Sequence, residues 1–436
     1  MPCVHCVDCR QLGKSNMKIL HASTRESRGG GAAIAAKRLH LGLLAAGVDS
    51  HMAVAIPQED SPRTFPVGGK ISRNILRPLG MRLEAAVRAC YPQPEQAAYA
   101  SFSFCPSLQH VRLNNIPKDI LHLHSVVEGF LSPWALGRLR GPVVWTMHDA
   151  WPFTGGCHYW STPCLRYEKN CGCCPLLGCT GGRDLSYWHW YLKHKAVQRL
   201  KPVIVSPSTM YARKAANSGI LGNCRIEVIP NGIDVALFKH IPKEQARNIL
   251  DLPQDMRIIL FGAISATSDR NKGYDLLLQA LYALPAVERE LLLAVVFGAS
   301  EAKDALPCPS RFLGRLHDEI SLALAYSAAD IFICPSRHEA FSLTTLEALA
   351  CGTPVVAFAV GGIPDMVDHG LSGYLATPYA PDDLASGIAL LLNDVELCNR
   401  MGEAGREKVL RKFALDNVVQ QYLNLYNSLL DAEKHD

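Results

Sequence analysis

The sequence predicts an α/β protein made of two doubly wound domains in tandem. Its 436 residues are too many for one ordinary hydrophobic core and suit two domains of about 200 residues each. Short apolar segments alternate with amphipathic helical patterns along the chain, and the alternation restarts in the second half. Strand, helix and strand at this spacing are typical of a parallel sheet with right-handed crossovers. Two such sheets would face a cleft lined by the carboxyl ends of their strands.

Each half contains five segments that predict buried strands. Amphipathic helices are expected between the first two strands, over 32–47, and early in the second half, over 274–284. The pattern over 406–430 predicts one long helix that packs back across both domains. The predicted strands are 18–22, 51–56, 120–124, 142–147, 202–206, 257–262, 291–298, 311–314, 330–335 and 354–358.

These patterns divide the chain into four parts. Residues 1–16 look unlike the rest and are expected to be an extension or a misassigned start, because Met17 begins the first strand. A metal site built from three cysteines and a histidine in that extension is the alternative. The predicted domains are 17–240 and 241–410, followed by a crossing helix and tail over 411–436.

The composition excludes several classes of protein. The chain is 48% hydrophobic and 19% charged, and its net charge of +4 is too weakly basic to indicate a nucleic-acid partner. That charge does suit an anionic ligand or a membrane surface. The longest apolar runs are about half the length that a membrane span requires. No apolar h-region of a secretory signal is present, so we expect a cytoplasmic protein, in which disulfides are disfavoured.

Two glutamates flank the start of a predicted helix in "CPSRHEAFSLTTLEALACGTPVVAF". Glu339 lies in the loop after a buried strand, and Glu347 lies on the helix that begins near Leu343. The N–H groups of the first turn, from Ser342 to Thr345, would point at the same place and suit a phosphate. Two carboxylates that accept from hydroxyls beside an anion site fit a sugar nucleotide. A solvated loop with two incidental glutamates is the alternative.

Two further motifs could bind an anion. In "DRNKGYDLLLQAL", Arg270 and Lys272 converge with a helix N-terminus on one space, unless they are solvated residues at a turn. Gly30 and Gly31 end the first strand–helix turn and let the backbone approach a ligand closely. The next strand does not end in the acidic residue typical of a dinucleotide site, which disfavours a dinucleotide cofactor.

His148 and Asp149 immediately follow the strand predicted over 142–147. Side chains at that point of a parallel sheet reach the cleft. A histidine there is a good proton carrier or hydrogen-bond donor near neutral pH. A satisfied core histidine is the alternative.

Taken together, these motifs resemble those of the retaining glycosyltransferases of family 4. Glu339 and Glu347 have that family's E-x7-E spacing. The segments "VSPSTMYARKAANSGI", "IPNGID", "NKGYDLLLQAL" and "GGIPDMVDHGLSGYLATP" follow in the family's order, over residues 17–430. The resemblance implies the GT-B fold, in which two Rossmann-like domains face a cleft, with 17–240 on the acceptor side and 241–410 on the nucleotide-sugar side. It implies transfer from a UDP- or GDP-linked sugar, with retention, to a glycan or lipid-linked oligosaccharide in polysaccharide assembly.

The resemblance also implies a role for each matching residue. Glu347 would bind the ribose of the donor, and Glu339 would bind hydroxyls of the transferred sugar. Lys272 and the amides of the glycine turn would neutralise the diphosphate. His148 would contact the sugar or its developing charge, and no catalytic metal is expected. The residues predicted at the donor site are Gly30, Gly31, Arg270, Lys272, Phe341, Ser342, Leu343 and Glu347, with His148 and Glu339 as further catalytic residues.

Two positions depart from the family pattern. The segment "FGAIS" at 261–265 lacks the arginine usual after the first strand of the second domain, and Arg270 would supply that charge. Asp365 stands where a glutamate is usual.

Six cysteines lie within the 23 residues "CHYWSTPCLRYEKNCGCCPLLGC", from 157 to 179. Four of them follow the spacing C-x6-C-x6-C-x2-C, which suits a tetrahedral zinc ion in a reducing compartment. We therefore expect a structural zinc clip beside the active site, with an iron–sulfur cluster or free thiols as alternatives. The pattern also resembles a branch of the family that includes colanic-acid and other exopolysaccharide glycosyltransferases. The expected ligands are Cys157, Cys164, Cys171 and Cys174, and the spare candidates are Cys173, Cys179 and His158.

Residues 63–90 carry six cations, a single acid and interleaved apolar side chains. Such a segment can lie among the headgroups of an anionic membrane. The family resemblance favours a peripheral enzyme, because many members of the family use lipid-linked acceptors at the inner face of the cytoplasmic membrane. A solvated loop and helix is the alternative, and Pro78 with Gly80 is expected to break any long helix here. The cations are Arg63, Lys70, Arg73, Arg77, Arg82 and Arg88.

Two other functions stay open at this point. A sugar-nucleotide epimerase could share the two-domain fold, although the E-x7-E spacing argues against it. Residues 157–179 could instead be a zinc module for nucleic acid or protein on a non-catalytic scaffold. Only three cations lie near that stretch, too few for a surface that tracks phosphates.

Overall fold

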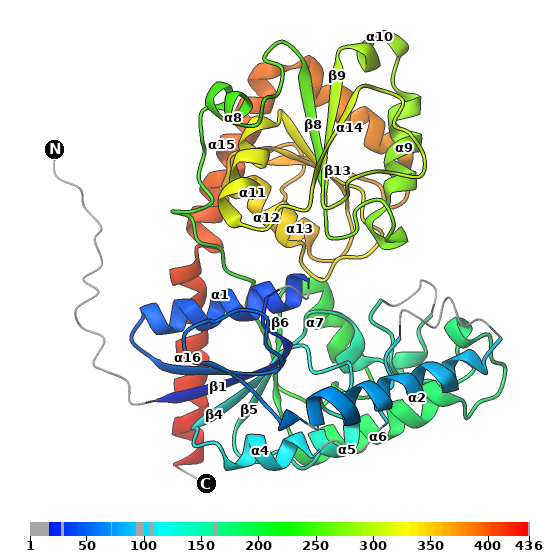
Figure 1. Cartoon of the computed structure of the whole chain (residues 1–436), viewed down its shortest axis with the longest axis vertical. Coiled ribbons are helices and arrows are strands. Elements are labelled where there is room, and N and C mark those ends of the chain that lie inside the picture. The colour runs from blue at the N-terminus through cyan, green and yellow to red at the C-terminus, as the bar shows by residue number, and fades with distance from the viewer. Residues whose placement is uncertain are drawn as a thin grey trace.

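The computed structural model describes residues 17–27, 30–70, 72–92, 100–104, 108–159 and 164–434. The predicted N-terminal extension, 1–16, lies outside the described residues. Two parallel sheets, each flanked by helices, form the two halves of the molecule (Figure 1). Two doubly wound units in tandem are therefore confirmed.

The first sheet has seven parallel strands in the order β3-β2-β1-β4-β5-β6-β7. Its central strands β4, β5 and β6 are buried at every position, which explains their uninterrupted apolar sequences. The strands are β1 (Lys18–Arg25), β2 (Asp49–Ile56), β3 (Thr64–Pro66), β4 (Ile120–Leu123), β5 (Val143–Thr146), β6 (Val203–Ser206) and β7 (Ile226–Val228). The helices are α1 (Gly31–Ala45), α2 (Arg77–Ala89), α4 (Gln109–Asn115), α5 (Pro133–Leu136), α6 (Leu185–Leu200) and α7 (Thr209–Ala216).

The second sheet has six parallel strands in the order β10-β9-β8-β11-β12-β13. All ten strands predicted from the sequence are present, whereas the short strands β3, β7 and β13 were not predicted. The strands are β8 (Arg257–Gly262), β9 (Leu292–Phe297), β10 (Ser310–Gly314), β11 (Ile331–Cys334), β12 (Val355–Phe358) and β13 (Gly373–Ala376). The helices are α8 (Lys243–Ile249), α9 (Tyr274–Ala283), α10 (Ala286–Glu290), α11 (Glu319–Ala328), α12 (Leu343–Ala350), α13 (Ile363–Met366), α14 (Pro381–Asn393), α15 (Val395–Lys412) and α16 (Leu415–Glu433).

The C-terminal tail crosses back to the first half, but it is two helices and the prediction of one long helix was wrong. The chain breaks between α15 and α16, where Ile233 N–H donates to the carbonyl of Phe413 at 3.0 Å. Leu415 N–H in turn donates to the carbonyl of Ile233 at 2.9 Å. The carbonyl of Phe413 and the N–H of Leu415 therefore bond to Ile233 and do not form the hydrogen bonds that would continue one helix. Beyond the break, α16 packs Val418 and Tyr426 into the core of the first sheet, and Figure 1 shows it alongside that sheet.

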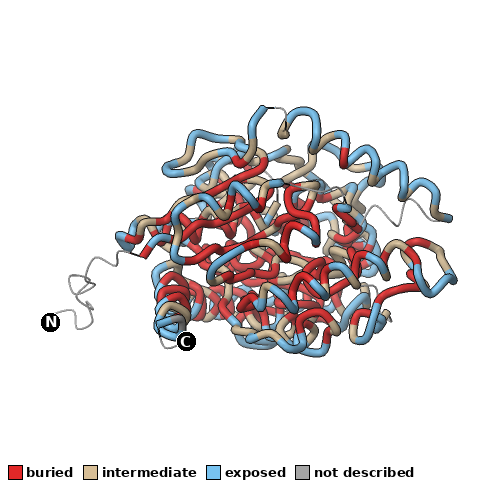
Figure 2. The backbone as a smooth tube through the Cα atoms, turned by 90° about the horizontal axis from the view of Figure 1, so that it is seen from below, coloured by how far each residue is buried: buried red, intermediate tan, exposed pale blue. Residues whose placement is uncertain are grey.

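The chain passes between the halves twice, between β7 and β8 and again at the α15–α16 junction. We retain 17–240, 241–410 and 411–436 as proposed limits of the domains and tail. Buried residues fill the interior, and exposed residues lie around the rim (Figure 2). Within the described ranges, no helix has both the length and the apolar character needed to cross a bilayer.

The basic segment contains a continuous helix, contrary to the expected break. Pro78 lies in the first turn of α2, where a missing N–H removes no intrahelical hydrogen bond. The only buried residue of α2 is Gly80, so the helix lies on the surface of the molecule.

Candidate functional site

Glu347 is buried on α12 and is held by two donors. Its Oε1 accepts from Nη2 of Arg38 at 2.7 Å, and its Oε2 accepts from the hydroxyl of Tyr326 at 3.0 Å. Burial raises the pKa of Glu347, and the positive charge of Arg38 opposes that shift without cancelling it. The carboxylate is thus ordered before any ligand arrives.

Arg38 is a residue that the sequence analysis missed. It comes from α1 in the first half, and it also donates from Nε at 3.0 Å and Nη2 at 2.8 Å to Glu319 at the start of α11. Its side chain is only 9% exposed, and its Nη1 is buried with no partner among the described residues. Arg38 lies three residues after Ala35 on the buried face of α1. A cation among the apolar residues of that face was the sequence feature that could have identified Arg38 as a site residue.

Glu339 and Lys272, which the sequence analysis assigns to different parts of the donor, lie in direct contact. Their side chains form an ion pair at 2.9 Å, and both are largely buried. Burial alone would lower the pKa of Lys272, but the charge of Glu339 outweighs it and raises the pKa. Tyr159 lies near this pair, and burial raises its pKa to about 12. Its ring stacks on His338 at 6.1 Å, so the cysteine-rich segment lies beside the site, as expected, although this contact of Tyr159 was not predicted.

Two glycines allow close backbone approaches around this ion pair. Gly273 has φ of 71°, and a Cβ there would lie 1.9 Å from the carbonyl oxygen of Pro335. Gly361 has φ of 58°, and a Cβ there would lie 1.5 Å from the carbonyl oxygen of Glu339. Only glycine fits either position, which explains the glycines of "NKG" and "VGGIPD".

The two helix N-termini of the predicted anion site face each other. A Cβ on Gly31 would lie 3.6 Å from Cδ1 of Leu343, so the start of α1 lies against the start of α12. Ser342 caps α12 and accepts from the N–H of Thr345. The side chain of Phe341 packs on Phe413 at 5.9 Å, so only its backbone is available to a ligand. Gly30 precedes α1 with φ of 101°, which leaves the first amides of that helix open.

Arg270 is not gathered into the site. Its side chain is exposed, and its carbonyl accepts from Nη1 of Arg337 at 2.7 Å. The expectation that Arg270 replaces the missing arginine therefore finds no support in the geometry. Asp365 accepts from the N–H of Thr209 at 2.6 Å, so it caps α7 across the two halves.

His148 lies two residues beyond β5 and is half-buried. Its Nε2 lies 3.0 Å from Nδ1 of His124, and burial lowers its pKa to about 4. It lines a cavity of about 10 Å³ together with Asn231 and Tyr422, which is room for about one water. Asp149 is engaged within its own half of the molecule, where it accepts from Nδ1 of His158 at 2.7 Å.

The cysteine-rich segment brings its thiols close without gathering three of them within ligand distance. Within the described ranges, the one set of three candidate ligands that lie within 4.8 Å of one another is His21, His122 and His124. Cys171 accepts from the N–H of Gly155 at 3.1 Å. A hydrogen bond with Cys157 and further bonds from backbone N–H groups lower the pKa of Cys174 to about 7.

Comparison with known proteins assigns the family. The model described as "Glycosyltransferase Family 4" matches residues 29–237, and the model described as "Glycosyl transferases group 1" matches residues 242–408. The chain belongs to glycosyltransferase family 4. The predicted family is therefore confirmed, whereas the exopolysaccharide branch is not.

The curated relatives match part of the chain. It is 33% identical to a D-inositol 3-phosphate glycosyltransferase of Thermobispora bispora over 227 residues, which is 48% of this chain and 51% of the relative. It is 39% identical to an N-acetyl-alpha-D-glucosaminyl L-malate synthase of Bacillus anthracis over 124 residues, 28% of this chain and 32% of the relative. The chain thus spans about half or less of the length of these relatives.

Solved structures of the family share the fold along nearly the whole chain. A sucrose-phosphate synthase of Thermosynechococcus elongatus superposes with a TM-score of 0.65 at 22% identity, covering 95% of this chain and 100% of that one. Anabaena Alr3699/HepE in complex with UDP and glucose superposes with a TM-score of 0.63 at 17% identity, covering 94% and 100%. The GT-B fold is thereby confirmed, and identities this low carry the fold alone.

Proposed function

We propose that this protein is a retaining glycosyltransferase that uses a nucleotide sugar. The observation that carries the proposal is the cluster of Glu347, Glu339 and Lys272 around the N-terminus of α12. A buried carboxylate suits ribose hydroxyls, and a cation beside helix N–H groups suits a diphosphate. The halves meet at this point, as a ligand bound between two parallel sheets requires.

The chemistry follows from where charge develops. As the sugar leaves, negative charge grows on the diphosphate, and the ammonium of Lys272 and the first-turn amides of α12 are in place to stabilise it. Glu339 would hold sugar hydroxyls and keep Lys272 oriented. His148 would contact the sugar. No divalent metal is needed for these interactions, because the lysine and helix dipoles supply the positive charge.

The acceptor is proposed to be a glycan or lipid-linked oligosaccharide in exopolysaccharide, capsule or lipopolysaccharide assembly. One structural neighbour, WaaG, is described as a glycosyltransferase of lipopolysaccharide biosynthesis, and HepE is described in complex with UDP-glucose. These descriptions concern those proteins, but they make UDP-glucose a sensible first donor to test against GDP-linked sugars.

The test begins with a thermal-shift panel of nucleotide sugars on the purified chain. A ligand that binds only the folded state raises the melting temperature. The donor with the largest shift is then supplied with candidate acceptors, and the anomeric configuration of the product is read by NMR. A glycoside of retained configuration is expected. An epimerised nucleotide sugar without any glycoside would instead indicate the epimerase alternative.

Lys272→Met should lower the rate of glycosyl transfer by roughly 10- to 100-fold, because a charge-assisted hydrogen bond contributes about 1.5–3 kcal/mol. Lys408→Met is the matched control, since Lys408 is a buried lysine of the same half that pairs with Asp368 at 2.9 Å. Equal activity of the two variants would remove Lys272 from the site.

A structural zinc ion held by Cys157, Cys164, Cys171 and Cys174 is a separate proposal. The N–H of Gly155 donates to the sulfur of Cys171 and favours the thiolate that zinc needs, whereas burial raises the pKa of this thiol to about 12, so a zinc ion would have to supply the remaining stabilisation. Lys193 supports the same conclusion. It is fully buried, donates to the carbonyls of Trp151 and Thr154, and has no carboxylate hydrogen-bonded to it among the described residues. Burial lowers the pKa of Lys193 to about 7, and a thiolate–zinc group nearby would favour its charged form.

Elemental analysis of protein purified under reducing conditions should find about one zinc per chain. Cys171→Ser should lower that content, whereas Cys224→Ser, a half-buried cysteine outside the segment, should leave it unchanged. Protein without stoichiometric metal would end this proposal.

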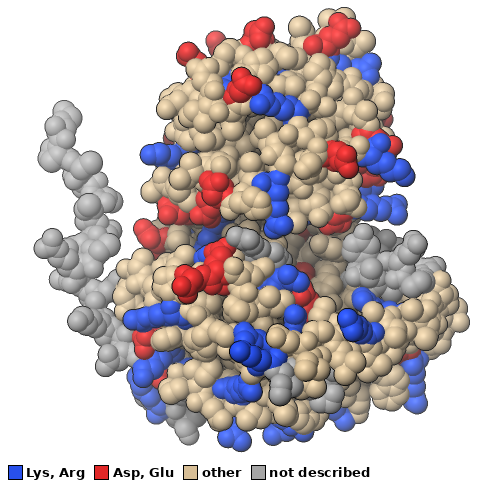
Figure 3. Space-filling model, in the orientation of Figure 1, with Lys and Arg blue, Asp and Glu red and all other residues tan. Residues whose placement is uncertain are grey.

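Membrane association through α2 is the last proposal of this section. Leu79, Leu83 and Val87 recur at helical spacing along its exposed surface, and the exposed Leu76 directly precedes the helix. The single acid, Glu84, is turned inward and accepts from the N–H groups of Phe102 and Ser103, both at 2.9 Å. On the face seen in Figure 3, Lys and Arg outnumber Asp and Glu over the lower half of the molecule. An apolar stripe with flanking cations suits an anionic lipid surface.

Sedimentation with anionic liposomes tests this association. Leu79→Glu with Leu83→Glu should abolish binding, and added salt should weaken it. Tyr282→Glu, on an exposed residue of the other half, should have no effect. Full recovery of the wild type in the supernatant at low salt would make α2 an ordinary surface helix.

A further inference from the structure

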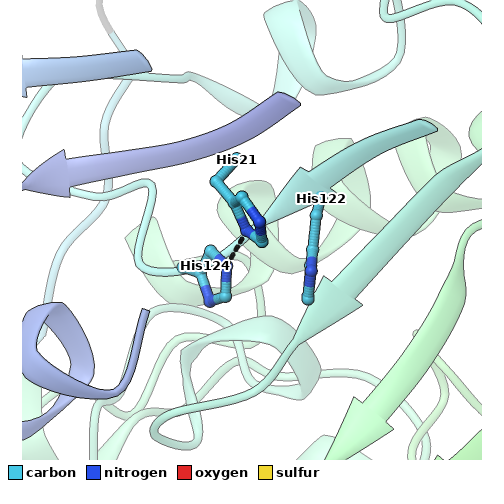
Figure 4. A group of neighbouring side chains, drawn as sticks. All are labelled: His21, His122 and His124. Carbon is cyan, nitrogen blue, oxygen red and sulfur yellow. Dashed lines mark hydrogen bonds between the residues drawn. The ribbon is translucent and has the colours of Figure 1, made fainter. Parts of the chain in front are cut away.

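A chain of three histidines runs from the core of the first sheet to His148. Nδ1 of His21 lies 2.9 Å from Nε2 of His124, and Nδ1 of His124 lies 3.0 Å from Nε2 of His148. His21 lies on β1, His124 directly follows β4, and His148 follows β5, so neighbouring strands supply successive rings. Figure 4 shows the hydrogen bond between His21 and His124, with His122 beside them.

The neighbouring set of His21, His122 and His124 could be considered for a metal ion, but five of its six ring nitrogens are already hydrogen-bonded, and only Nε2 of His21 has no partner among the described residues. His122 is hydrogen-bonded at both nitrogens, to the hydroxyls of Tyr426 and Thr146, each at 2.7 Å. Both nitrogens of His124 are held by the other two rings of the chain. A separation of 2.9 Å is that of an N–H group and a nitrogen acceptor. A hydrogen-bonded relay therefore describes these contacts better than a metal site.

The rings are neutral, and this limits how the relay can be arranged. Burial lowers the pKa of His148 to about 4 and holds the pKa values of His21 and His124 well below the ordinary value. A neutral imidazole carries one N–H group, so three rings in series must all point the same way. Either every proton is on Nδ1, or every proton is on Nε2.

The buried end of the relay decides between these two arrangements. Nε2 of His21 is buried and has no hydrogen-bond partner among the described residues. If the protons were on Nε2, this atom would be an N–H group without an acceptor, which is rare inside native proteins. The proton of His21 is therefore on Nδ1, from which it donates to His124.

We propose that His21 and His124 are positioning residues that hold His148 with its proton on Nδ1. His124 donates from Nδ1 to Nε2 of His148, which leaves Nδ1–H of His148 as a hydrogen-bond donor. That atom has no partner within the described part of the chain, and the ring lines the cavity beside Asn231. The next step rests on the proposed function. This N–H group donates a hydrogen bond to an oxygen of the transferred sugar, and nucleotide sugars that lack an oxygen at that place are disfavoured.

Nuclear magnetic resonance of full-length protein labelled with [15N]histidine tests the proton positions directly, without any substrate. The signals of His148 are assigned by their loss in His148→Asn. The wild type should show His148 and His124 with protonated Nδ1, and His124→Leu should release His148 to the other tautomer. A wild-type His148 with its proton on Nε2 would overturn the proposal. This measurement stands even if no donor is ever found, so it is separate from a failure of the proposed function.

Kinetics test what the proton position does. His124→Leu should lower kcat roughly tenfold or more, with a smaller change in the KM for the donor. His124→Asn should recover most of kcat, because its amide nitrogen lies near the place of Nδ1. The control is His40→Leu, a buried histidine that hydrogen-bonds Ser50 and the carbonyl of Pro62 outside the relay. An equal loss in the control would make His124 a structural residue and would overturn the proposal.

Two substitutions of His148 keep the proposal testable if His124→Leu does not fold. Asparagine places an amide where Nδ1 lies, and glutamine places one where Nε2 lies. His148→Asn should therefore retain more transfer than His148→Gln. The reverse order would contradict the proposal, as would a stoichiometric metal that is lost in His124→Asn.

Discussion

One backbone contact sets the position of Glu339. The carbonyl of Glu339 lies where a side chain of Gly361 would begin, and Gly362 N–H donates to the same carbonyl at 3.2 Å. The loop that carries the carboxylate is thus held by the loop after β12. Any side chain at Gly361 must push Glu339 away from Lys272.

Gly361→Ala should therefore weaken donor binding at least tenfold and lower stability by about 1–3 kcal/mol. Gly370→Ala is the matched control, because Gly370 also has a positive φ, of 77°, but no atom lies within 4 Å of its Cβ position. Donor affinity by calorimetry and melting temperature distinguish the two variants. Similar donor affinity in both would mean that the close approach does not position Glu339.

At the scale of elements, α16 is attached to the first sheet by a buried polar network. His122 on β4 joins the hydroxyl of Tyr426 on α16 to that of Thr146 on β5. Thr146 in turn lies 3.1 Å from the hydroxyl of Tyr422. A neutral His122 ring has one nitrogen that donates and one that accepts, and the network depends on this neutral form. Burial lowers the pKa of His122 to about 3, which keeps the ring neutral.

Acid should therefore destabilise this attachment. Between about pH 6.5 and pH 3 the unfolded chain binds a proton at His122 that the folded chain does not, so stability falls as the pH falls, by about 1.4 kcal/mol per pH unit. Above pH 6.5 the contribution is complete. Lowering the pH from 7.5 to 5 should reduce the melting temperature less in His122→Gln than in the wild type. His317→Gln, at an exposed histidine, should follow the wild type. Identical pH profiles for all three proteins would contradict the prediction.

At the scale of the whole molecule, Arg38 joins the two halves. It lies 309 residues before Glu347 in the chain, yet their atoms meet at 2.7 Å. Removing one partner of a buried ion pair leaves an uncompensated charge, which typically costs about 3–5 kcal/mol. The contact therefore favours the closed arrangement of the halves.

Arg38→Ala should open the molecule and weaken donor binding. Small-angle X-ray scattering of the ligand-free protein should give a larger radius of gyration, and the donor Kd should rise more than tenfold. Lys37→Ala is the control, because Lys37 lies next to it on α1 but pairs with Glu59 inside the same half. An unchanged radius and Kd in Arg38→Ala would show that the ion pair does not control closure.

The sequence by itself determined the two doubly wound units, the positions of their main strands along the chain and the family. Those signals are local: apolar periodicity and motif spacing are written in neighbouring residues, and each strand or helix follows its own stretch. The expectation that Glu339 and Lys272 lie in one cleft also followed, because both motifs lie at carboxyl ends of strands in one sheet, whereas the ion pair between them was seen only in the structure.

Only the tertiary structure decided which residues meet across the molecule. The contact of Arg38 with Glu347, that of His21 with His124, and the break between α15 and α16 each depend on segments that are distant in the chain. At Phe413 the helical pattern continues in the sequence, but hydrogen bonds to Ile233 end the helix. The apolar periodicity of the segment around a residue carries no information on which residue, roughly 100 or more positions away, will contact it. Packing alone selects such contacts.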